Sequence, residues 1–260
     1  MLNAVIFGTG NIASHFTPAI SKIAELNVSS IFARSEEKAR LVIGDGQINI
    51  IYNYAAIPED TDVVFLMVND DAIKSVTAKL SEHLQSSTMI IHFSGSMGLS
   101  EIHEHFHHTG IMWPIQTISK SDSSLVLKET PLSISFSDEY TKEKLDRWAA
   151  HLSNHKYYLS EDQKKVVHLS AVFANNFTNH MYVIAKELLN AEGLNFELIT
   201  PLILKTAQSA LYNDPALNQT GPAKRQDKNT MDKQLDLLSD VDQKAIYQLI
   251  SKNIDKKNNS

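Results

Sequence analysis

The sequence contains no cysteine among its 260 residues. Disulfide bonds, thiolate nucleophiles and cysteine-ligated zinc are therefore excluded, and a reducing cytoplasm is the compartment that this composition favours. No apolar run reaches the roughly 18 residues that a membrane-spanning helix needs, so no membrane partner is expected. The apolar stretch at residues 2–7 is too short for a signal peptide and runs directly into a glycine turn.

Positive charge is also scarce. The chain has 24 lysines and arginines against 30 aspartates and glutamates, which gives a formal net charge of −6. No basic stripe is present that could neutralise phosphates, so nucleic acid is not an expected partner. Hydrophobic residues make up 43% of the chain, and at this length that is enough to build a sizeable core.

The first half of the chain alternates short apolar runs with helical patterns. We expect strands at residues 4–7, 29–33, 48–52, 62–68, 89–93, 110–113 and 132–136. The run at 62–68 is almost entirely apolar, which is typical of a strand that is covered on both faces. Strands separated by helical segments imply βαβ units and a mainly parallel sheet.

The second half shows no strand pattern after Leu159. Ser160 and Gln163 have the spacing of a capping box, and the helix that follows is expected to continue to about residue 191. Pro201 suits the first turn of another helix. These patterns predict an α/β fold, in which a Rossmann-type, mainly parallel sheet at residues 1–158 is followed by an all-helical domain at residues 159–260.

A glycine turn at residues 8–13, Gly-Thr-Gly-Asn-Ile-Ala, joins the first strand to the first helix. In such turns the first glycine permits a tight bend, the second lets the backbone approach a pyrophosphate, and a small third residue permits close packing. The helix N-terminus adds free N–H groups and partial positive charge. We therefore expect a dinucleotide to be bound by Gly8, Thr9, Gly10, Asn11 and Ile12. The alternative is a glycine turn that binds nothing.

The end of the second strand distinguishes NADP from NAD. NAD sites usually carry an acidic residue there, for the ribose hydroxyls. This chain has Arg34 and Ser35 instead, followed by Lys38. Arginine pairs with a 2′-phosphate, serine donates a hydrogen bond to it, and lysine adds charge. The sequence predicts NADP as cofactor, the alternative being that Arg34 is a solvated surface residue.

Two further strand ends are expected to line the nicotinamide half of the cofactor, with Val68-Asn69 after one strand and Ser94-Gly95 after the next. The neighbouring pair Asp70-Asp71 is expected to begin a helix rather than to bind a metal. The histidine-rich segment 103–108 lacks the spacing of a zinc-binding helix. We expect it to be an exposed helix end, and we expect no metal site.

The long helix of the second half has a polar middle. His168, Asn175 and Asn179 are spaced seven and eleven residues apart and are expected to share a face, with Asn176 about 80° round from His168. An imidazole and several amides on one side could bind the reacting group of a substrate. The alternative is that they are satisfied polar groups of the core, or contacts across a dimer.

With these motifs, the chain resembles a family of Rossmann-like NADP oxidoreductases with a helical C-terminal domain of unknown function. The family lies within the 6-phosphogluconate dehydrogenase-like superfamily, beside the pyrroline-5-carboxylate reductases. The resemblance spans nearly the whole chain. Its marks are residues 8–11, 92–96, 114–116 (Pro-Ile-Gln), His168 with Asn176, and above all residues 220–227 (Thr-Gly-Pro-Ala-Lys-Arg-Gln-Asp). It implies a helical domain that pairs two subunits into a homodimer, and a cleft between the domains, but no substrate.

The chain departs from the family pattern at three positions. Trp113 and Lys233 stand where the family often has histidine, and Val172 stands four residues before Asn176, where superfamily dehydrogenases often have lysine. A lysine-based mechanism is therefore not expected. His168 is the predicted proton donor, and Asn176 is expected to position the carbonyl or the carboxamide.

Substrate contacts are expected from Gln116, Asn175, Thr220 and Arg225. Arg225 could clamp a substrate carboxylate, or it could pair with Asp227 or another acid. The resulting hypothesis is an NADP-dependent reductase or dehydrogenase that acts on a small C=O or C=N substrate. Two alternatives remain open: an NADP-binding sensor or scaffold without turnover, and a helical interaction protein with a vestigial nucleotide site.

Overall fold

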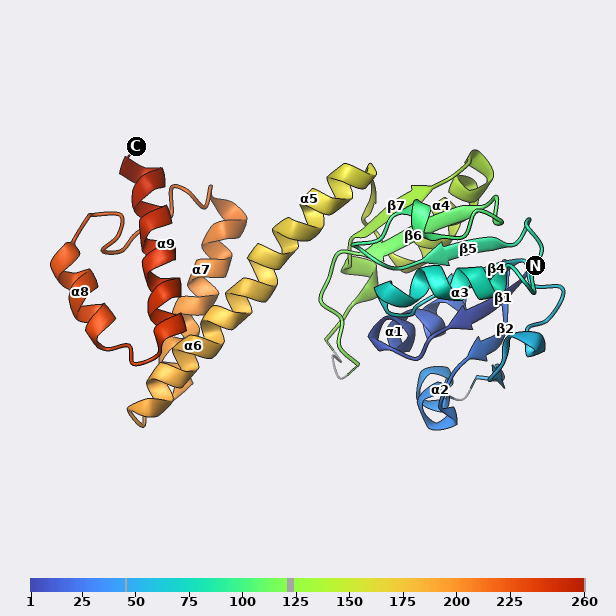
Figure 1. Ribbon diagram of the computed structural model, residues 1–260, viewed down its shortest axis with the longest axis horizontal. Helices are drawn as coiled ribbons and strands as arrows, with labels where there is room; N and C mark the ends of the chain where they lie inside the picture. Colours follow the sequence, from blue (N-terminus) through green and yellow to red (C-terminus); the bar gives the residue numbers. More distant parts are fainter. Residues whose placement is uncertain (45, 121–123, 260) are drawn as a thin grey trace. The chain divides into compact units, whose positions relative to one another are not determined.

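The structure is a computed structural model that describes residues 1–44, 46–120 and 124–259, with side chains up to residue 257. The chain forms two compact units, Met1–Phe173 and Ala174–Ser260. The N-terminal unit holds the sheet, and the C-terminal unit is built from helices (Figure 1).

One eight-stranded sheet forms the N-terminal unit. Its strands are β1 (Leu2–Phe7), β2 (Leu26–Phe32), β3 (Asn49–Ile51), β4 (Val63–Leu66), β5 (Met89–His92), β6 (Thr109–Pro114), β7 (Leu132–Phe136) and β8 (Lys156–Tyr158). The strand order is β3-β2-β1-β4-β5-β6-β7-β8. Within the described residues, β6 and β7 are the one antiparallel pair, and the other neighbouring strands run parallel. The first six strands have the order of a Rossmann fold, which confirms the predicted fold class.

Helices cover both faces of this sheet. They are α1 (Asn11–Ile20), α2 (Glu36–Ile43), α3 (Ile73–Leu80) and α4 (Glu139–Leu152). Alternate strand residues point to opposite faces. Ile6 and Phe65 therefore share a core with Phe16 of α1 and Trp148 of α4. Val5, Val64 and Ile90 instead pack with Ile73 and Leu80 of α3.

One segment between the strands has the structure that the sequence predicts, and another does not. Asp70 and Asp71 begin the 3₁₀ turn η2 (Asp70–Ala72), which leads into α3, as expected. The histidine-rich segment 103–108 is not a helix end: it consists of turns between the 3₁₀ turn η3 (Leu99–Glu101) and β6. Phe106 is its buried anchor, and the His105 ring binds the carbonyl of Leu84. Among the described residues, no group of histidines and carboxylates could hold a metal ion.

The long helix begins where the sequence predicts but does not remain an α-helix. The capping box between Ser160 and Gln163 is present at the start of α5 (Glu161–Ala171). A π-helical stretch η5 (Val172–Phe177) follows, and α6 runs over Thr178–Ala191. Because a π-helix has more residues per turn than an α-helix, the α-helical period that predicted a common face for His168 and Asn175 does not apply across it.

The rest of the C-terminal unit consists of α7 (Thr200–Tyr212), α8 (Lys228–Asp236) and α9 (Val241–Asn259). Pro201 occupies the first turn of α7, as expected. The sheet ends at Tyr158, the residue where we placed the domain boundary, whereas the compact units divide at residue 173, within the π-helix. Over the described ranges, no helix has the length and the hydropathy to cross a membrane.

Candidate active site at the carboxyl edge of the sheet

The turn between β1 and α1 has the geometry that its two glycines predict. Gly8 adopts φ +117°, and a Cβ atom there would stand 2.1 Å from the carbonyl oxygen of Met67, at the end of β4. A Cβ at Gly10 would meet no atom within 4 Å. Gly8 is therefore required by the fold itself, whereas Gly10 faces open space beside the helix N-terminus.

The N-terminus of α1 is left available for an anion. Gly10 is its N-cap residue and supplies no side chain, and the first turn contains no acidic residue. Thr9 and Asn11 flank Gly10, and Ile12 packs against the core. The first N–H groups of a helix need a partner, and together with the helix dipole they favour a phosphate.

The end of β2 presents the residues that we expect to read the 2′-phosphate. Arg34 is exposed, and among the described residues it forms no ion pair. The nearest acid, Glu36, binds Arg40 at 2.7 Å instead. Ser35 is the N-cap of α2 and accepts the N–H of Lys38 at 3.4 Å. The Ser35 hydroxyl can still donate a hydrogen bond, so its capping role and its predicted phosphate contact are compatible.

The loop after β5, residues Ser94–Gly98, is held tightly, and we call it the β5 loop. The Ser94 hydroxyl accepts the N–H groups of Ser96 and Met97 at 3.2 and 3.1 Å. His92 lies beneath the loop: its Nδ1 accepts the Ser94 N–H at 3.2 Å, and its Nε2 lies 3.3 Å from the Gly98 carbonyl oxygen. This pattern requires the neutral ring with the proton on Nε2.

Burial explains why that ring stays neutral. His92 is fully buried, which lowers its pKa to about 4; the positive charge of Lys164 acts in the same direction, and the Gly98 carbonyl and Asp70 oppose the shift. At neutral pH, the uncharged His92 side chain therefore holds the β5 loop in place by its two hydrogen bonds.

The end of β4 joins the same loop. Val68 packs against the second core, and Asn69 is the exposed N-cap of η2. The next residue, Asp70, accepts a short hydrogen bond from the hydroxyl of Ser96. The structure thus brings together the two strand ends that we expect to line the nicotinamide half.

Trp113, at the end of β6, forms a wall beside this loop. A Cβ at Gly95 would lie 2.5 Å from Cε2 of its indole, so only glycine fits beneath it. The imidazole of His168 meets the indole edge to face, with ring centroids 5.7 Å apart. His168 is half-buried, and its ring has no hydrogen-bond partner among the described residues. Gln116 lies farther along and is exposed; its side-chain oxygen accepts the Thr117 N–H at 2.9 Å.

Lys164 is a residue that our sequence analysis missed. It is 1% exposed, and its ammonium donates a short hydrogen bond to the Met97 carbonyl of the β5 loop. Burial lowers the pKa of Lys164, which the negative charges of Glu161 and Asp70 oppose. The signal was available, since the capping box fixes the phase of α5, and Glu161, Lys164 and His168 follow at helical spacing on one face.

The other predicted site residues belong to the C-terminal unit. Asn175 and Asn176 lie on the exposed surface of the π-helix. Thr220 lines an apolar cavity of about 300 Å³ together with residues of α6, α8 and α9. Arg225 is exposed and makes no ion pair within the part of the chain that the structure describes.

Asp227, the acid that we considered as a partner for Arg225, has a different role. It is the N-cap of α8, and its carboxylate binds the N–H and the hydroxyl of Thr230 at 3.1 and 2.7 Å. These hydrogen bonds lower its pKa, and the charge of Arg225 adds to the effect. Arg225 therefore stays available for a substrate carboxylate, which remains a prediction.

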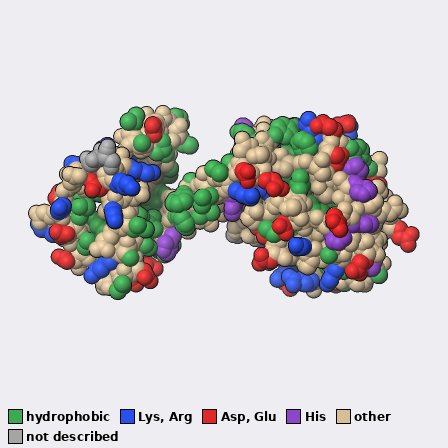
Figure 2. Space-filling view, turned by 45° about the horizontal axis from the view of Figure 1, so that its top comes forward, with side chains coloured by type: hydrophobic (Ala, Val, Ile, Leu, Met, Phe, Trp, Pro, Cys, Tyr) green, Lys and Arg blue, Asp and Glu red, His purple; other side chains and the backbone are tan. Residues whose placement is uncertain are grey.

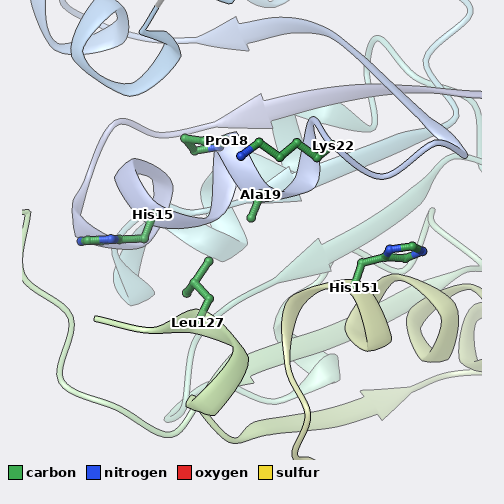
Figure 3. A pocket seen from close by; sticks show the side chains of 6 residues that line it. All are labelled: His15, Pro18, Ala19, Lys22, Leu127 and His151. Atoms are coloured by element: carbon green, nitrogen blue, oxygen red, sulfur yellow. The ribbon is translucent and has the colours of Figure 1, made fainter. Parts of the chain in front are cut away.

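A different pocket lies between α1, α4 and the 3₁₀ turn η4 (Leu127–Glu129) and has a volume of about 310 Å³ (Figure 3). Leu127 and Ala19 point toward each other across it, whereas His15 and His151 stand at opposite ends and point apart. The ring of His15 binds the Ser119 carbonyl at 2.8 Å. These polar groups do not converge, so we assign no chemistry to this pocket.

Comparisons with known proteins agree with this picture. Residues 3–94 match the family described as NADP oxidoreductase coenzyme F420-dependent, and residues 130–254 match a domain of unknown function, DUF2520. A comparison with curated proteins found no match.

Solved structures extend the comparison to the whole chain. A candidate NADP oxidoreductase from Bacteroides fragilis is 30% identical, with 98% of each chain covered and a TM-score of 0.88. A protein from Thermotoga maritima is 20% identical, with 98% of each chain covered and a TM-score of 0.71. The pyrroline carboxylate reductase of Plasmodium falciparum, with NADP bound, shares the fold at 13% identity and a TM-score of 0.57, over 99% of this chain and 97% of that one.

These matches confirm the resemblance that the motifs indicated and agree with NADP as the expected cofactor. This chain belongs to the family of NADP oxidoreductases in which a Rossmann-type domain is followed by a DUF2520 domain.

Proposed function

We propose that this protein transfers a hydride between NADP(H) and a small substrate that carries a C=O or C=N group. The observation that carries the proposal is the carboxyl edge of the sheet. At this edge, the N-terminus of α1 has no side-chain cap, and the space beside Gly10 is open. The guanidinium of Arg34 is exposed and forms no ion pair with any described residue. The helix N-terminus can bind the phosphates of a dinucleotide, and the guanidinium can bind a 2′-phosphate.

Bound NADPH supplies the hydride, so the protein has to orient the substrate and provide a proton. His168 is our candidate for the proton donor. It is half-buried against Trp113, and its ring makes no hydrogen bond to any described residue. During reduction, His168 gives its proton to the oxygen or nitrogen of the substrate while the hydride goes to carbon. We propose that Asn176 positions the reacting group, with Gln116, Asn175, Thr220 and Arg225 as further substrate contacts.

The proposal includes a homodimer formed through the C-terminal unit. Several large apolar side chains of this unit are exposed in the single chain: Leu202 (66%), Leu211 (78%), Leu237 (80%) and Leu249 (70%). Figure 2 shows hydrophobic side chains gathered on the surface of this unit. Exposed apolar area on this scale favours an interface, and a second copy of the chain is the occupant that we propose. The cytoplasm, which the lack of cysteine favours, is the proposed location.

A two-stage experiment tests the function. Binding of NADPH is measured first, and NADPH oxidation is then screened against keto acids, aldehydes and cyclic imines. Binding together with turnover of one class supports the proposal. Tight binding without turnover in any class favours the sensor, and absence of binding favours the interaction protein with a vestigial site.

A further inference from the structure

One face of α5 makes three contacts with the β5 loop and its immediate surroundings. Glu161 accepts the N–H of Leu99 at 3.1 Å, just beyond the loop. One turn later, Lys164 donates to the Met97 carbonyl, and after one more turn His168 meets Trp113. All of these residues belong to the N-terminal unit. The helix that carries the candidate proton donor and the loop after β5 therefore form one connected structure.

The loop is also fixed from its other side. His92 binds the Ser94 N–H and the Gly98 carbonyl from below, and Asp70 holds the Ser96 hydroxyl. The Met97 carbonyl is held by Lys164 alone among the described residues. Removing the ammonium would free this carbonyl, while the hydrogen bonds that Ser94, His92 and Asp70 make to the rest of the loop stay in place.

The burial of Lys164 is costly for a residue that only fills space. A buried ammonium needs a charge partner or several hydrogen bonds, and an apolar side chain of similar length would pack at lower cost. Lys164 is 1% exposed, and no carboxylate approaches it to ion-pair distance in the described part of the chain. Asp70 and Glu161 act on it only at longer range. The free-energy cost of burying this charge indicates that the position of the β5 loop serves a purpose other than stability.

We propose that Lys164 is a positioning residue, which holds the β5 loop in the shape that receives the nicotinamide half of NADP. The proposal rests on the proposed function, because it assumes that the dinucleotide lies across the carboxyl edge. In a Rossmann sheet, β1 to β3 serve one mononucleotide half and β4 to β6 the other. The β5 loop and Asp70 lie in the second half, and Arg34 lies in the first.

This division permits a test with two ligands, NADPH and adenosine 2′,5′-bisphosphate. The second ligand carries the adenosine and the 2′-phosphate but lacks the nicotinamide half. In Lys164→Met we expect the Kd for NADPH to rise about tenfold or more, as for a loop that adopts the receiving shape about one tenth of the time or less. We expect the Kd for adenosine 2′,5′-bisphosphate to stay within about twofold of the wild-type value, because its contacts lie elsewhere.

Lys165→Met is the matched control. Lys165 is the next residue of α5, is exposed, and bridges only to Asp162 at 3.3 Å. We expect it to bind both ligands as the wild type does. Lys164→Gln serves as a second variant should Lys164→Met fail to fold. Its shorter, neutral side chain does not reach the carbonyl, and we expect the same split between the ligands.

The outcomes separate this proposal from the proposed function. The proposal is overturned if a Lys164 variant binds both ligands more weakly by the same factor, or binds both as the wild type does. Lys164 is then a structural residue of α5. If wild-type protein binds neither ligand, the proposed function fails. The lysine proposal is then wrong as well, because it assumes a bound nicotinamide half. If the wild type binds both ligands and the Lys164 variants do not distinguish between them, only the lysine proposal is overturned.

Discussion

Gly8 and Met67 approach so closely that any side chain at residue 8 would collide with the backbone, since a Cβ there would lie 2.1 Å from the Met67 carbonyl oxygen. Gly8 also has a positive φ, whereas Gly10 has φ −82° and open space around it. Replacement by alanine is therefore expected to affect stability at Gly8 and cofactor binding at Gly10.

We expect Gly8→Ala to lower the free energy of unfolding by about 3 kcal/mol or more, because strain and collision add. We expect Gly10→Ala to change the unfolding free energy by less than about 1 kcal/mol and still to weaken NADPH binding, because its methyl group would fill the space that we propose for the pyrophosphate. Denaturant unfolding and NADPH titration of both variants check this. A stable Gly10→Ala protein with wild-type affinity would show that the turn does not hold the cofactor.

His168→Ala tests the proton donor. We expect kcat for the substrate found in the screen to fall by about 100-fold or more, while the Kd for NADPH stays unchanged, because only proton transfer is lost. His180→Ala, a substitution of an exposed histidine on α6, is the control and should retain full turnover. Equal turnover in His168→Ala and the wild type would assign the proton to another group.

His92 makes stability depend on pH. Its folded pKa is about 4 against an ordinary value of 6.5, so between these values the unfolded chain binds a proton that the folded chain does not. The stabilisation is complete above pH 6.5 and is lost as the pH falls toward 4, by up to about 1.4 kcal/mol per pH unit. Denaturant unfolding at several pH values measures this slope. His92→Gln should reduce it, and His151→Gln, at an exposed position, should retain it; an unchanged slope in His92→Gln would contradict the assignment.

The proposed dimer predicts the particle mass in solution. We expect sedimentation to give twice the chain mass of 29.1 kDa. Leu202→Asp, which places a charge on the exposed apolar surface of the C-terminal unit, should shift the protein toward monomer. Leu41→Asp alters an equally exposed leucine on α2 of the N-terminal unit and should leave the dimer intact. A monomeric wild type, or a dimer that withstands Leu202→Asp, would contradict this interface.

Seven of the eight strands could be predicted from the sequence because they carry strong local signals, whereas β8 was missed, since its three residues are all exposed and form no apolar run. The apolar runs, the glycine turn and the capping box at Ser160 each depend on neighbouring residues only, and each is present in the structure. The prediction for the histidine-rich segment 103–108 was wrong. We expected an exposed helix end, but the burial of Phe106 and the hydrogen bond between the His105 ring and the Leu84 carbonyl are tertiary contacts that impose turns.

The site was less predictable for a related reason. The capping box fixes the helix face on which Lys164 lies, but its burial depends on the β5 loop, which is distant in sequence. The π-helix at Val172–Phe177 likewise leaves no simple periodic signal, so the predicted common face of His168 and Asn175 rested on the wrong helical period. The exposed position of Arg34 could be predicted because it depends only on following the second strand, and its contact with a 2′-phosphate stays a prediction.

The central claim is that this edge of the sheet binds NADP and that Arg34 recognises the 2′-phosphate. Calorimetric titration of wild type and Arg34→Ala with NADPH and NADH tests it most directly. We predict that the wild type prefers NADPH, and that Arg34→Ala weakens NADPH by about 10- to 100-fold with little change for NADH, since one bidentate charged contact is lost. NADPH binding that is as tight in Arg34→Ala as in the wild type would contradict the account.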